Sequence, residues 1–521
     1  MKKLLCLFTI VSRFCQAQTT AGDNLFNVTQ IHTININFPQ TNYWTLLVNN
    51  KTYDDANDSS TYIPAQVIID GNTLDSVGIQ FKGNSSYYNY PGNKKPFTLS
   101  FDEYKSEQKY DSLSSINLNN CYQDPSFMRE KLFLDFLNSK GLYAPRSNYA
   151  KLYINGVYSG FYQIGERINK PFCKDRFGNK GGNLFKGDGG GSACADLKYQ
   201  GTSQASYYGC YTLKTNKTAN NWSDLINLTN QINNTTTVQF KDSVDAYLNA
   251  NSFIGAWAAC NMFVDFDSYA FRFIHNYYIY HNTATNKFEW ITWDASTVFG
   301  MDVPGSVASI EQKSIFYIEP NAADRPLANR MLNDTAYKNQ YLNYICDFLN
   351  TFQPSVLNPK IDSLYALIKA DVYADPLKMY SNNEFDTNIS SNVVVNGITY
   401  PGLKSFIQNR STNIQNELNT LGMNCSLLLG ANDINVNENL FNVFPNPSTG
   451  SLFIDYNLSG SIEVSVKIID VLGREISIIR NTIQPSGQYK KEISVDLPNG
   501  VYNVVLNAGN TIANKKIIIT R

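Results

Sequence analysis

Carboxylates bracket a predicted β-hairpin near the middle of the chain. Residues 277–280 and 288–293 are expected to form two strands, because aromatic and β-branched runs flank a short polar segment. Asp267 precedes the hairpin, Asn276 stands directly before its first strand, and Asp294 directly follows its second strand. One carboxylate could orient an acceptor hydroxyl while the other holds a cation against phosphate charge, as metal-dependent phosphoryl transfer requires. On spacing alone, an ordinary surface hairpin with capping aspartates is the alternative.

The composition limits the chemistry that the chain can perform. Its 521 residues suffice for two or three domains, and the formal net charge of -1 gives no electrostatic basis for binding nucleic acid or an anionic membrane surface. Histidine occurs only three times; His32 lies in a strand-like run, so a Ser-His-Asp or Cys-His hydrolase would have to use His275 or His281. The sequence has no Gly-X-Ser-X-Gly elbow, so metal-assisted chemistry by carboxylates is favoured.

Residues 1–17 have the features of a secretion signal. Lys2 and Lys3 provide a positive start, a short apolar run covers residues 4–11, and Ala17 is small, as signal cleavage requires. This run is far below the roughly 20 residues of a membrane-spanning helix. We therefore expect an exported mature chain without a transmembrane segment.

Cysteine usage fits an oxidising destination. Two of the nine cysteines lie in the signal, and the seven that follow leave at least one thiol free. Cys173, Cys194 and Cys210 cluster around a Gly-rich segment, where a Cys194–Cys210 disulfide is the best guess. The sequence has no Cys-X-X-Cys spacing, so a zinc site is not expected.

Hydrophobic periodicity divides the chain into a body and a small end domain. The body, residues 18–430, begins with strands between residues 31 and 101, continues with a helix from Ser126, and becomes largely helical in its second half. An Asn-rich linker at 431–439 leads to residues 440–521, where short strands and turns predict an all-β sandwich. A ligand site is favoured where the β-rich and helical parts of the body meet.

Small and basic residues in the β-rich part are candidate phosphate ligands. Gly83, Asn84 and Ser85 offer small side chains and backbone N–H groups that could approach phosphates. Lys94 and Lys95 precede a strand, from which one ammonium could reach the phosphates. A solvated hairpin tip with two exposed lysines is the alternative.

Glu166 is a candidate partner for that lysine. It lies on the predicted strand GFYQIGER, where it could position the lysine or bind metal. It could equally pair with Arg167 or Arg129 at the surface.

Seven segments, in order, resemble the CotH kinase family, the secreted and spore-coat atypical protein kinases. They are GIQFKGNSSYYNYPGNKKPFTLSFD, DPSFMREKLFLDFL, APRSNYAKLYINGVYSGFYQIGERI, NLFKGD, YTLKTN, the hairpin region 267–300 and GLKSFIQNR. The resemblance covers about residues 31–421. It implies an α+β, protein-kinase-like body of two lobes that transfers phosphate from ATP to Ser or Thr of a protein, with Mg²⁺ or Mn²⁺.

The resemblance also assigns roles within the hairpin region. Asp267 matches the acid that orients the acceptor hydroxyl, with Asp265 as the runner-up because the local sequence DFD is ambiguous. Asn276 and Asp294 match the family's metal-binding positions. The family usually shows Trp-Asp-Leu-Asp where this chain has Ser296 in place of the second acid, which puts cation binding and activity in doubt.

The end domain resembles the type A sorting domain of the type IX secretion system in Bacteroidota. The matching segments are FPNPSTGSLFIDY, DVLGREI, LPNGVYNVVL and the terminal KKIIITR. The resemblance implies an immunoglobulin-like sandwich, passage through the outer membrane by that machinery, and release or attachment at the cell surface. From the residues alone, a generic carbohydrate-binding or adhesive sandwich is the alternative.

Three functions stay open at this point. The first is a secreted kinase that phosphorylates Ser or Thr of a surface or extracellular protein. The second is a catalytically weak or inactive kinase-like module that acts in binding or adhesion, which Ser296 favours. The third is transfer of a nucleotidyl group from the same cleft.

Overall fold

The computed structural model describes residues 20–57, 59–187, 194–301, 306–318, 324–423, 425, 441–458, 462–470, 475–485, 487–494, 497–508 and 511–520. The chain forms two compact units, residues 1–417 and 418–521. The predicted signal peptide, 1–17, and the predicted linker, 431–439, lie outside the described residues.

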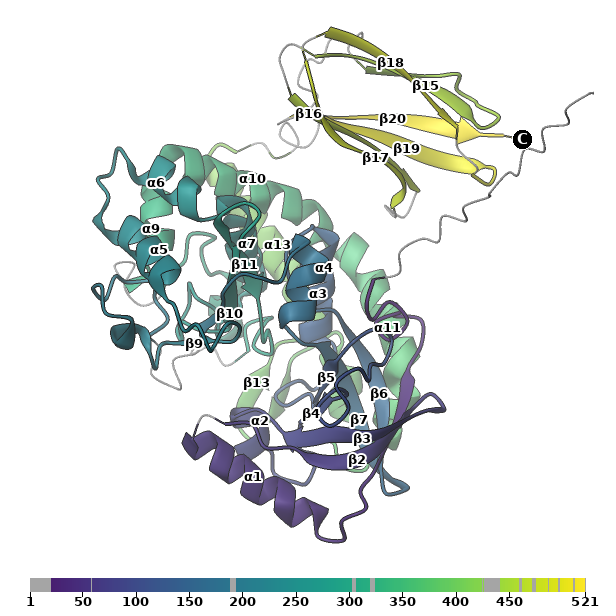
Figure 1. Ribbon diagram of the computed structural model, residues 1–521. Coiled ribbons are helices and arrows are strands. Elements are labelled where there is room, and N and C mark those ends of the chain that lie inside the picture. Colours follow the sequence, from purple (N-terminus) through teal and green to yellow (C-terminus); the bar gives the residue numbers. More distant parts are fainter. Residues whose placement is uncertain are drawn as a thin grey trace, which may run out of the picture. The chain divides into compact units, whose positions relative to one another are not determined.

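A closed β-barrel forms the first part of the larger unit (Figure 1). Its strand order is β1-β2-β3-β4-β5-β7-β6, and β1 closes the barrel by pairing in parallel with β6, with His32 opposite Ala150. The inward-facing side chains form one hydrophobic core. The strands are β1 (His32–Asn37), β2 (Ile63–Ile69), β3 (Asn72–Phe81), β4 (Phe97–Ser100), β5 (Ser115–Asn119), β6 (Ser147–Ile154) and β7 (Val157–Glu166).

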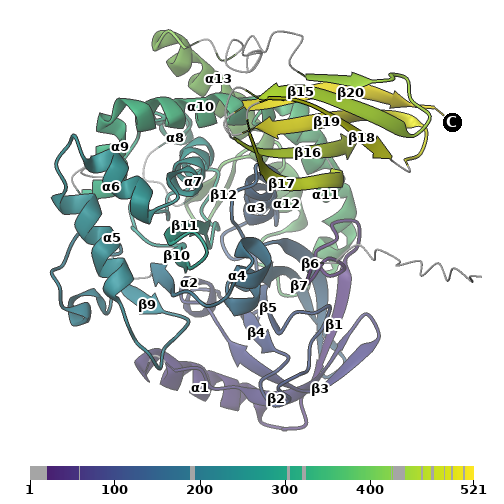
Figure 2. The same cartoon turned by 45° about the horizontal axis from the view of Figure 1, so that its top comes forward.

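A helix interrupts the segment 31–101, which was predicted to be mostly β. Helix α1 (Tyr43–Asn57) follows β1 and packs against β2 and β3 (Figure 2). Its buried residues are Leu47, Lys51 and Asp54. With one apolar residue among these three, the sequence lacks the apolar stripe by which an amphipathic helix is recognised.

A four-stranded sheet, β11-β10-β8-β9, forms the centre of the second part of this unit. The strands are β8 (Leu184–Gly187), β9 (Tyr211–Leu213), β10 (Tyr277–Asn282) and β11 (Lys287–Thr292). Strands β10 and β11 form the predicted hairpin, with Tyr277 opposite Thr292. Helix α7 (Ala250–Phe263) packs against β11 and is buried on nearly all sides, which explains its mostly apolar sequence.

The helices dominate the second half of the body, as the sequence predicted. The others in this unit are α2 (Ser85–Tyr88), α3 (Arg129–Ser139), α4 (Lys170–Phe177), α5 (Ser223–Asn234), α6 (Phe240–Tyr247), α8 (Val307–Glu311), α9 (Pro326–Asn333), α10 (Thr335–Thr351), α11 (Pro354–Ala374), α12 (Asn382–Asn388) and α13 (Leu403–Thr420), which runs on to the unit boundary. A short hairpin joins β12 (Val393–Val395) to β13 (Ile398–Tyr400). The body is therefore a mixed α/β unit with a barrel and a separate sheet.

The C-terminal unit is all-β, as predicted. One sheet has the order β14-β15-β18 and the other β17-β16-β19-β20. Alternate residues of both sheets meet in one hydrophobic core, which makes the unit a two-sheet sandwich. The strands are β14 (Phe441–Phe444), β15 (Ser451–Leu458), β16 (Ile462–Asp470), β17 (Glu475–Gln484), β18 (Gly487–Ser494), β19 (Gly500–Ala508) and β20 (Thr511–Ile519).

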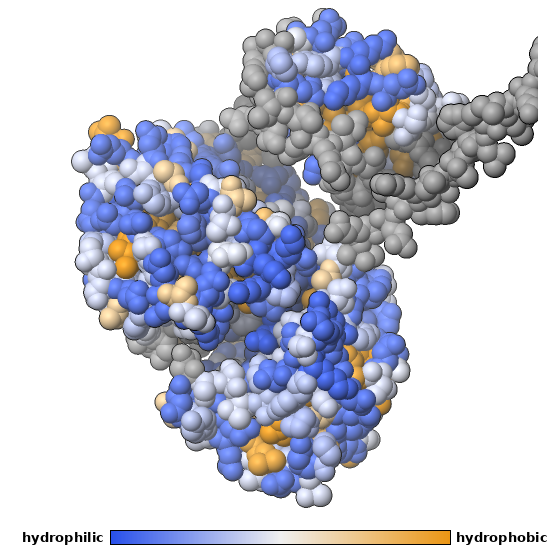
Figure 3. All heavy atoms as spheres, in the orientation of Figure 1, coloured by the Kyte–Doolittle hydropathy of each residue, from blue (hydrophilic) through white to orange (hydrophobic). Residues whose placement is uncertain are grey.

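The surface of the described residues is mainly hydrophilic on the face drawn in Figure 3, with small, separate hydrophobic patches. Among the described residues, no helix combines the length and the hydropathy that crossing a bilayer requires.

Candidate active site

A cleft of about 1280 Å³ lies between the barrel and the four-stranded sheet within the larger unit. The barrel side contributes the end of β3 and the loop after it, together with β5 and the first turn of α3. The opposite side contributes β8, β9 and the loops at both ends of the β10–β11 hairpin. The residues from these elements that matter for chemistry are Lys82, Gly83, Asn84, Ser85, Asn119, Glu130, Lys186, Asp267, His275, Asn276, Asp294 and Ser296.

Lys82 and Glu130 place opposite charges on the barrel side of the cleft. Lys82 directly follows β3, its Nζ donates to Oδ1 of Asn119 at 2.8 Å, and it lies 5.7 Å from the ring centroid of Trp293. Burial lowers the pKa of Lys82, and the charges of Asp294 and Glu130 oppose that shift. Burial and the Asp294 charge raise the pKa of Glu130 to about 7, while Lys82 opposes this shift.

Asp267 lies in the cleft with both carboxylate oxygens engaged. Oδ1 is in hydrogen-bond contact with Nε2 of His275, and Oδ2 accepts from Nδ2 of Asn276 at 2.8 Å. Burial raises the pKa of Asp267, and the contacts with His275 and Asn276 counteract that rise. The side chain is 21% exposed, so a ligand in the cleft can reach it.

Asp265, the runner-up for the same role, has a different environment. It is 1% exposed, does not line the cleft, and accepts a hydrogen bond at Oδ1 from Thr297 Oγ1 at 2.9 Å. Burial and the neighbouring Asp267 charge raise its pKa to about 7. Between the two aspartates of the DFD sequence, the geometry therefore favours Asp267 as the residue that meets a ligand.

Asp294 and Asn276 are brought together by the ends of the hairpin. The backbone N–H of Trp293 donates to the carbonyl of Asn276 at 3.1 Å, which ties the entry of β10 to the exit of β11. Both residues have left-handed backbones, with φ of +50° at Asp294 and +61° at Asn276. Such conformations are uncommon outside glycine and concentrate at functional sites. Ser296, which stands where the second acid was expected, also lines the cleft.

The donors around Asp294 suit a cation that shares its ligands with phosphate. The described residues contain no group of three or more His, Cys, Asp or Glu side chains arranged to hold a metal. Magnesium, however, is commonly bound by one or two carboxylates together with substrate phosphates and water. The Asp294 carboxylate and the Asn276 amide oxygen are donors of this kind, so the residues present fit Mg²⁺ or Mn²⁺ in the presence of a nucleotide.

Gly83, Asn84 and Ser85 lie in the cleft, as the sequence analysis expected of phosphate ligands. Gly83 has a φ of +82°, and a side chain at this position would collide with Oγ of Ser86. The loop therefore needs glycine here to keep its backbone close to the cleft.

The structure corrects the predicted placement of Lys94. Its side chain is fully buried and forms an ion pair with Asp375 at 2.7 Å, and Asp375 is buried as well. Neither residue lines the cleft. Lys94 joins the barrel to the segment that follows α11, and Lys82 occupies the cleft position that the sequence analysis gave to a lysine.

Lys95 and Glu166 also lie away from the cleft lining. Nζ of Lys95 donates to the carbonyls of Tyr87 at 2.7 Å and Tyr90 at 3.2 Å. Glu166 is 2% exposed and forms ion pairs with two arginines of the surrounding surface, Arg146 and Arg176. Glu166 is thus paired with arginine, but with Arg146 and Arg176 and in a buried position, instead of with Arg167 or Arg129 at the surface. The acidic residue that lines the barrel side of the cleft is Glu130.

Sequence reasoning missed Lys82 and Glu130, and it named His275 only as a residue that a hydrolase would need. Each lay inside a segment that had been singled out, but none had a local pattern that distinguished it from its neighbours. The available signal was positional: Lys82 ends a strand directly before a glycine, and Glu130 stands in the first turn of a buried helix.

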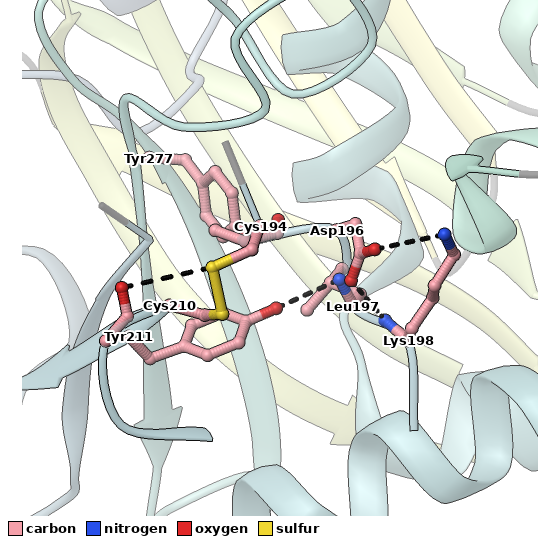
Figure 4. The surroundings of a disulfide bond; sticks show 9 residues. Cys194, Asp196, Leu197, Lys198, Cys210, Tyr211 and Tyr277 are labelled. Carbon is pink, nitrogen blue, oxygen red and sulfur yellow. Dashed lines mark hydrogen bonds and ion pairs between the residues drawn. A yellow bond between two sulfur atoms is a disulfide. The ribbon is translucent and has the colours of Figure 1, made fainter. Parts of the chain in front are cut away.

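A disulfide supports one wall of the cleft. Cys194 and Cys210 are bonded, as predicted, with their Cα atoms 5.1 Å apart (Figure 4). The hydroxyl of Tyr211, which lines the cleft, accepts from the backbone N–H of Leu197, and the hydroxyl of Tyr277 donates to the carbonyl of Ala195. The bonded loop is thus attached to both β9 and β10. Among the described cysteines that remain, Cys346 and Cys425 are also disulfide-bonded, and Cys121, Cys173 and Cys260 are free.

Comparisons with known proteins match two separate parts of the chain. Residues 79–414 match the CotH kinase protein family, and this range includes every cleft residue to which we assign chemistry. Residues 442–520 match the secretion system C-terminal sorting domain. The inner spore coat protein H of Bacillus subtilis (strain 168) is 26% identical over 328 residues, which is 62% of this chain and 85% of that protein.

Proposed function

The chain belongs to the CotH kinase protein family, and from this premise we propose that it transfers a phosphoryl group from ATP to a serine or threonine hydroxyl of a protein. The observation that carries the proposal is the convergence of Lys82, Asp267 and Asp294 on one cleft. An ammonium for phosphate, a carboxylate for the acceptor and a carboxylate for a cation are the parts that phosphoryl transfer needs.

The arrangement of these residues supports a kinase-like division into two lobes. The barrel and α3 carry Lys82 and Glu130, and the sheet on the other side of the cleft carries Asp267 and Asp294. A strand lysine with a helix glutamate, facing acidic groups that flank a hairpin, is the layout of a protein kinase.

Each residue has a defined part in the proposed reaction. Asp267 accepts the proton of the acceptor hydroxyl as the new O–P bond forms and the bond from phosphorus to ADP breaks. Lys82 binds phosphate oxygens, and the loop that begins at Gly83 approaches them with backbone N–H groups. Asp294 and the Asn276 oxygen would hold Mg²⁺ or Mn²⁺, which when bound offsets the charge on the phosphates.

The sorting domain supports an extracellular setting for this reaction. The C-terminal unit is a secretion-system sorting domain, which implies export by the type IX machinery. We therefore expect the protein to be released or attached at the cell surface after signal cleavage. The acceptor is then a protein of the surface or its surroundings, and the nucleotide must be supplied there or met during export.

The experiment uses labelled ATP with Mg²⁺ or Mn²⁺ and the mature chain. Wild type should incorporate label from the γ-phosphate. Asp267→Asn and Asp294→Ala should each lower the rate of incorporation at least about 100-fold, since each removes a charged group from the site. Asp362→Ala is a matched control, because Asp362 is 59% exposed, lies outside the cleft lining and pairs with Lys404. Incorporation of label from the α-phosphate would instead identify nucleotidyl transfer.

A second candidate function rests on Ser296. This residue gives the cleft a hydroxyl where the family usually has an acid, so a binding or adhesion module without catalysis is the alternative. Failure of the wild type to bind ATP in a thermal-shift titration, with either cation present, would favour that function and contradict the kinase proposal.

A further inference from the structure

The carboxylate of Asp267 is held by two consecutive residues of one turn. His275 contacts Oδ1 through Nε2, and Asn276 donates to Oδ2 through Nδ2. In an extended strand, neighbouring side chains point to opposite faces. Here Ile274 and Asn276 have left-handed backbones, with φ of +52° and +61°, and the turn directs both side chains to the same carboxylate.

We propose that His275 is a positioning residue for Asp267, an inference that rests on the function proposed above. A terminal carboxylate rotates over a broad range about its last side-chain bond. A donor on each oxygen fixes the plane of the group and leaves the outer lone pairs for the acceptor hydroxyl. His275 therefore sets the direction in which Asp267 meets the proton that it must accept.

His275 and Asn276 have different tasks in this arrangement. The Asn276 amide donates its N–H to Asp267 and keeps its oxygen for a cation, so its orientation depends on what the cleft holds. The His275 ring is supported on the protein side by stacking on Phe273, with ring centroids 6.0 Å apart at 26°. His275 thus provides a donor whose position does not depend on cation binding.

The location of this pair distinguishes it from the other histidine–aspartate pairs of the chain. His32 pairs with Asp70 at 2.6 Å and His281 pairs with Asp224 at 3.1 Å, so such a pair by itself indicates no function. Of the three histidines, only His275 lines the cleft, and its partner does so too.

In the reaction, the O–H bond of the acceptor breaks and its proton passes to Asp267. The acceptor oxygen bonds to the γ-phosphorus, and ADP leaves with the electron pair of the broken P–O bond. His275 exchanges no proton in this step. Its removal should therefore slow the transfer without weakening the binding of nucleotide.

The test compares His275→Ala and His275→Gln with His281→Ala in the mature chain. We expect kcat to fall about 10- to 100-fold in His275→Ala, the loss of one hydrogen bond to a charged group, with the Kd for ATP unchanged within about twofold. His275→Gln, which can present an N–H near the same place, should recover part of kcat. Added imidazole should also restore activity to His275→Ala, because the site is open to the cleft. His281→Ala should match wild type.

Two results would overturn the inference while leaving the kinase proposal intact. One is an unchanged kcat in His275→Ala when Asp267→Asn strongly lowers kcat. The other is a loss of kcat in His275→Ala that neither the glutamine substitution nor imidazole restores and that accompanies a lower midpoint of thermal unfolding. A purely structural role of His275 would give that result. Absence of transfer and of ATP binding in the wild type would instead overturn the proposed function and this inference together.

Discussion

Replacing Lys94 and Lys82 separately by methionine should affect two different properties of the protein. The sequence offered Lys94 and Lys95 as candidate phosphate ligands, whereas the structure buries Lys94 against Asp375 and places Lys82 in the cleft. We expect Lys94→Met to lower the free energy of unfolding and Lys82→Met to lower the affinity for ATP. Methionine suits both positions because it preserves the length of the aliphatic chain and removes only the charge.

The cost of Lys94→Met follows from the buried ion pair. Nζ of Lys94 lies 2.7 Å from Oδ2 of Asp375, and both side chains are 0% exposed. At an effective dielectric constant near 20, two unit charges at this distance attract by about 6 kcal/mol, which offsets the cost of their desolvation. Removing one partner leaves the other charge buried, at a cost of about 3–5 kcal/mol.

Lys82→Met has little reason to destabilise the fold. Burial already lowers the pKa of this lysine, so methionine removes a charge that the surroundings disfavour. The pKa of Glu130 is raised to about 7, so it can take up a proton once the lysine charge is gone. We expect the free energy of unfolding to stay within about 1 kcal/mol of wild type and the affinity for ATP to fall about 10- to 100-fold, as for one charged hydrogen bond.

Urea denaturation and an ATP titration on the same samples measure both effects. Asp375→Asn should resemble Lys94→Met in stability, and the double variant should cost less than the sum of the two single ones, since the residues are in contact. A Lys94→Met protein of wild-type stability that no longer binds ATP would refute this reasoning and return the phosphate role to Lys94.

Three further predictions concern the cleft and its surroundings. Because Glu130 ionises near pH 7, its electrostatic attraction to Lys82 should strengthen as pH rises through that value, and Glu130→Gln should flatten the corresponding rise in kcat/KM in a pH–rate profile. Folded Asp265 keeps its proton up to about pH 7 but loses it near 3.8 when unfolded, so its contribution to stability falls as pH rises between these values. In Asp265→Asn, the free energy of unfolding measured by urea denaturation should lose this decline between pH 5 and pH 8. A decline as large as that of wild type would contradict the prediction. Cys194→Ser with Cys210→Ser should cost about 2–4 kcal/mol of stability by urea denaturation, and a smaller loss would show that the loop is held by its tyrosine contacts alone.

The hairpin and the acids at its ends could be recognised from local sequence. Aromatic and β-branched runs, a polar turn and flanking aspartates are all encoded within about 35 residues, so Asp267, Asn276 and Asp294 could be named in advance. The Cys194–Cys210 bond and the all-β end domain were also predictable, because the two cysteines lie only 16 positions apart and short strands separated by turns fill the end domain.

Which charged residues face the cleft depends on long-range packing. Lys82 and Lys94 lie only twelve positions apart, yet Lys82 lines the cleft and Lys94 is buried against Asp375, far along the chain. Local periodicity carries no information about such distant partners. The choice between Asp265 and Asp267 likewise depends on burial, because Asp265 is buried while Asp267, two positions later, lines the cleft. Long-range packing sets the desolvation and the charge partners of a side chain, and these determine whether an ionisable group supports the fold or meets a ligand.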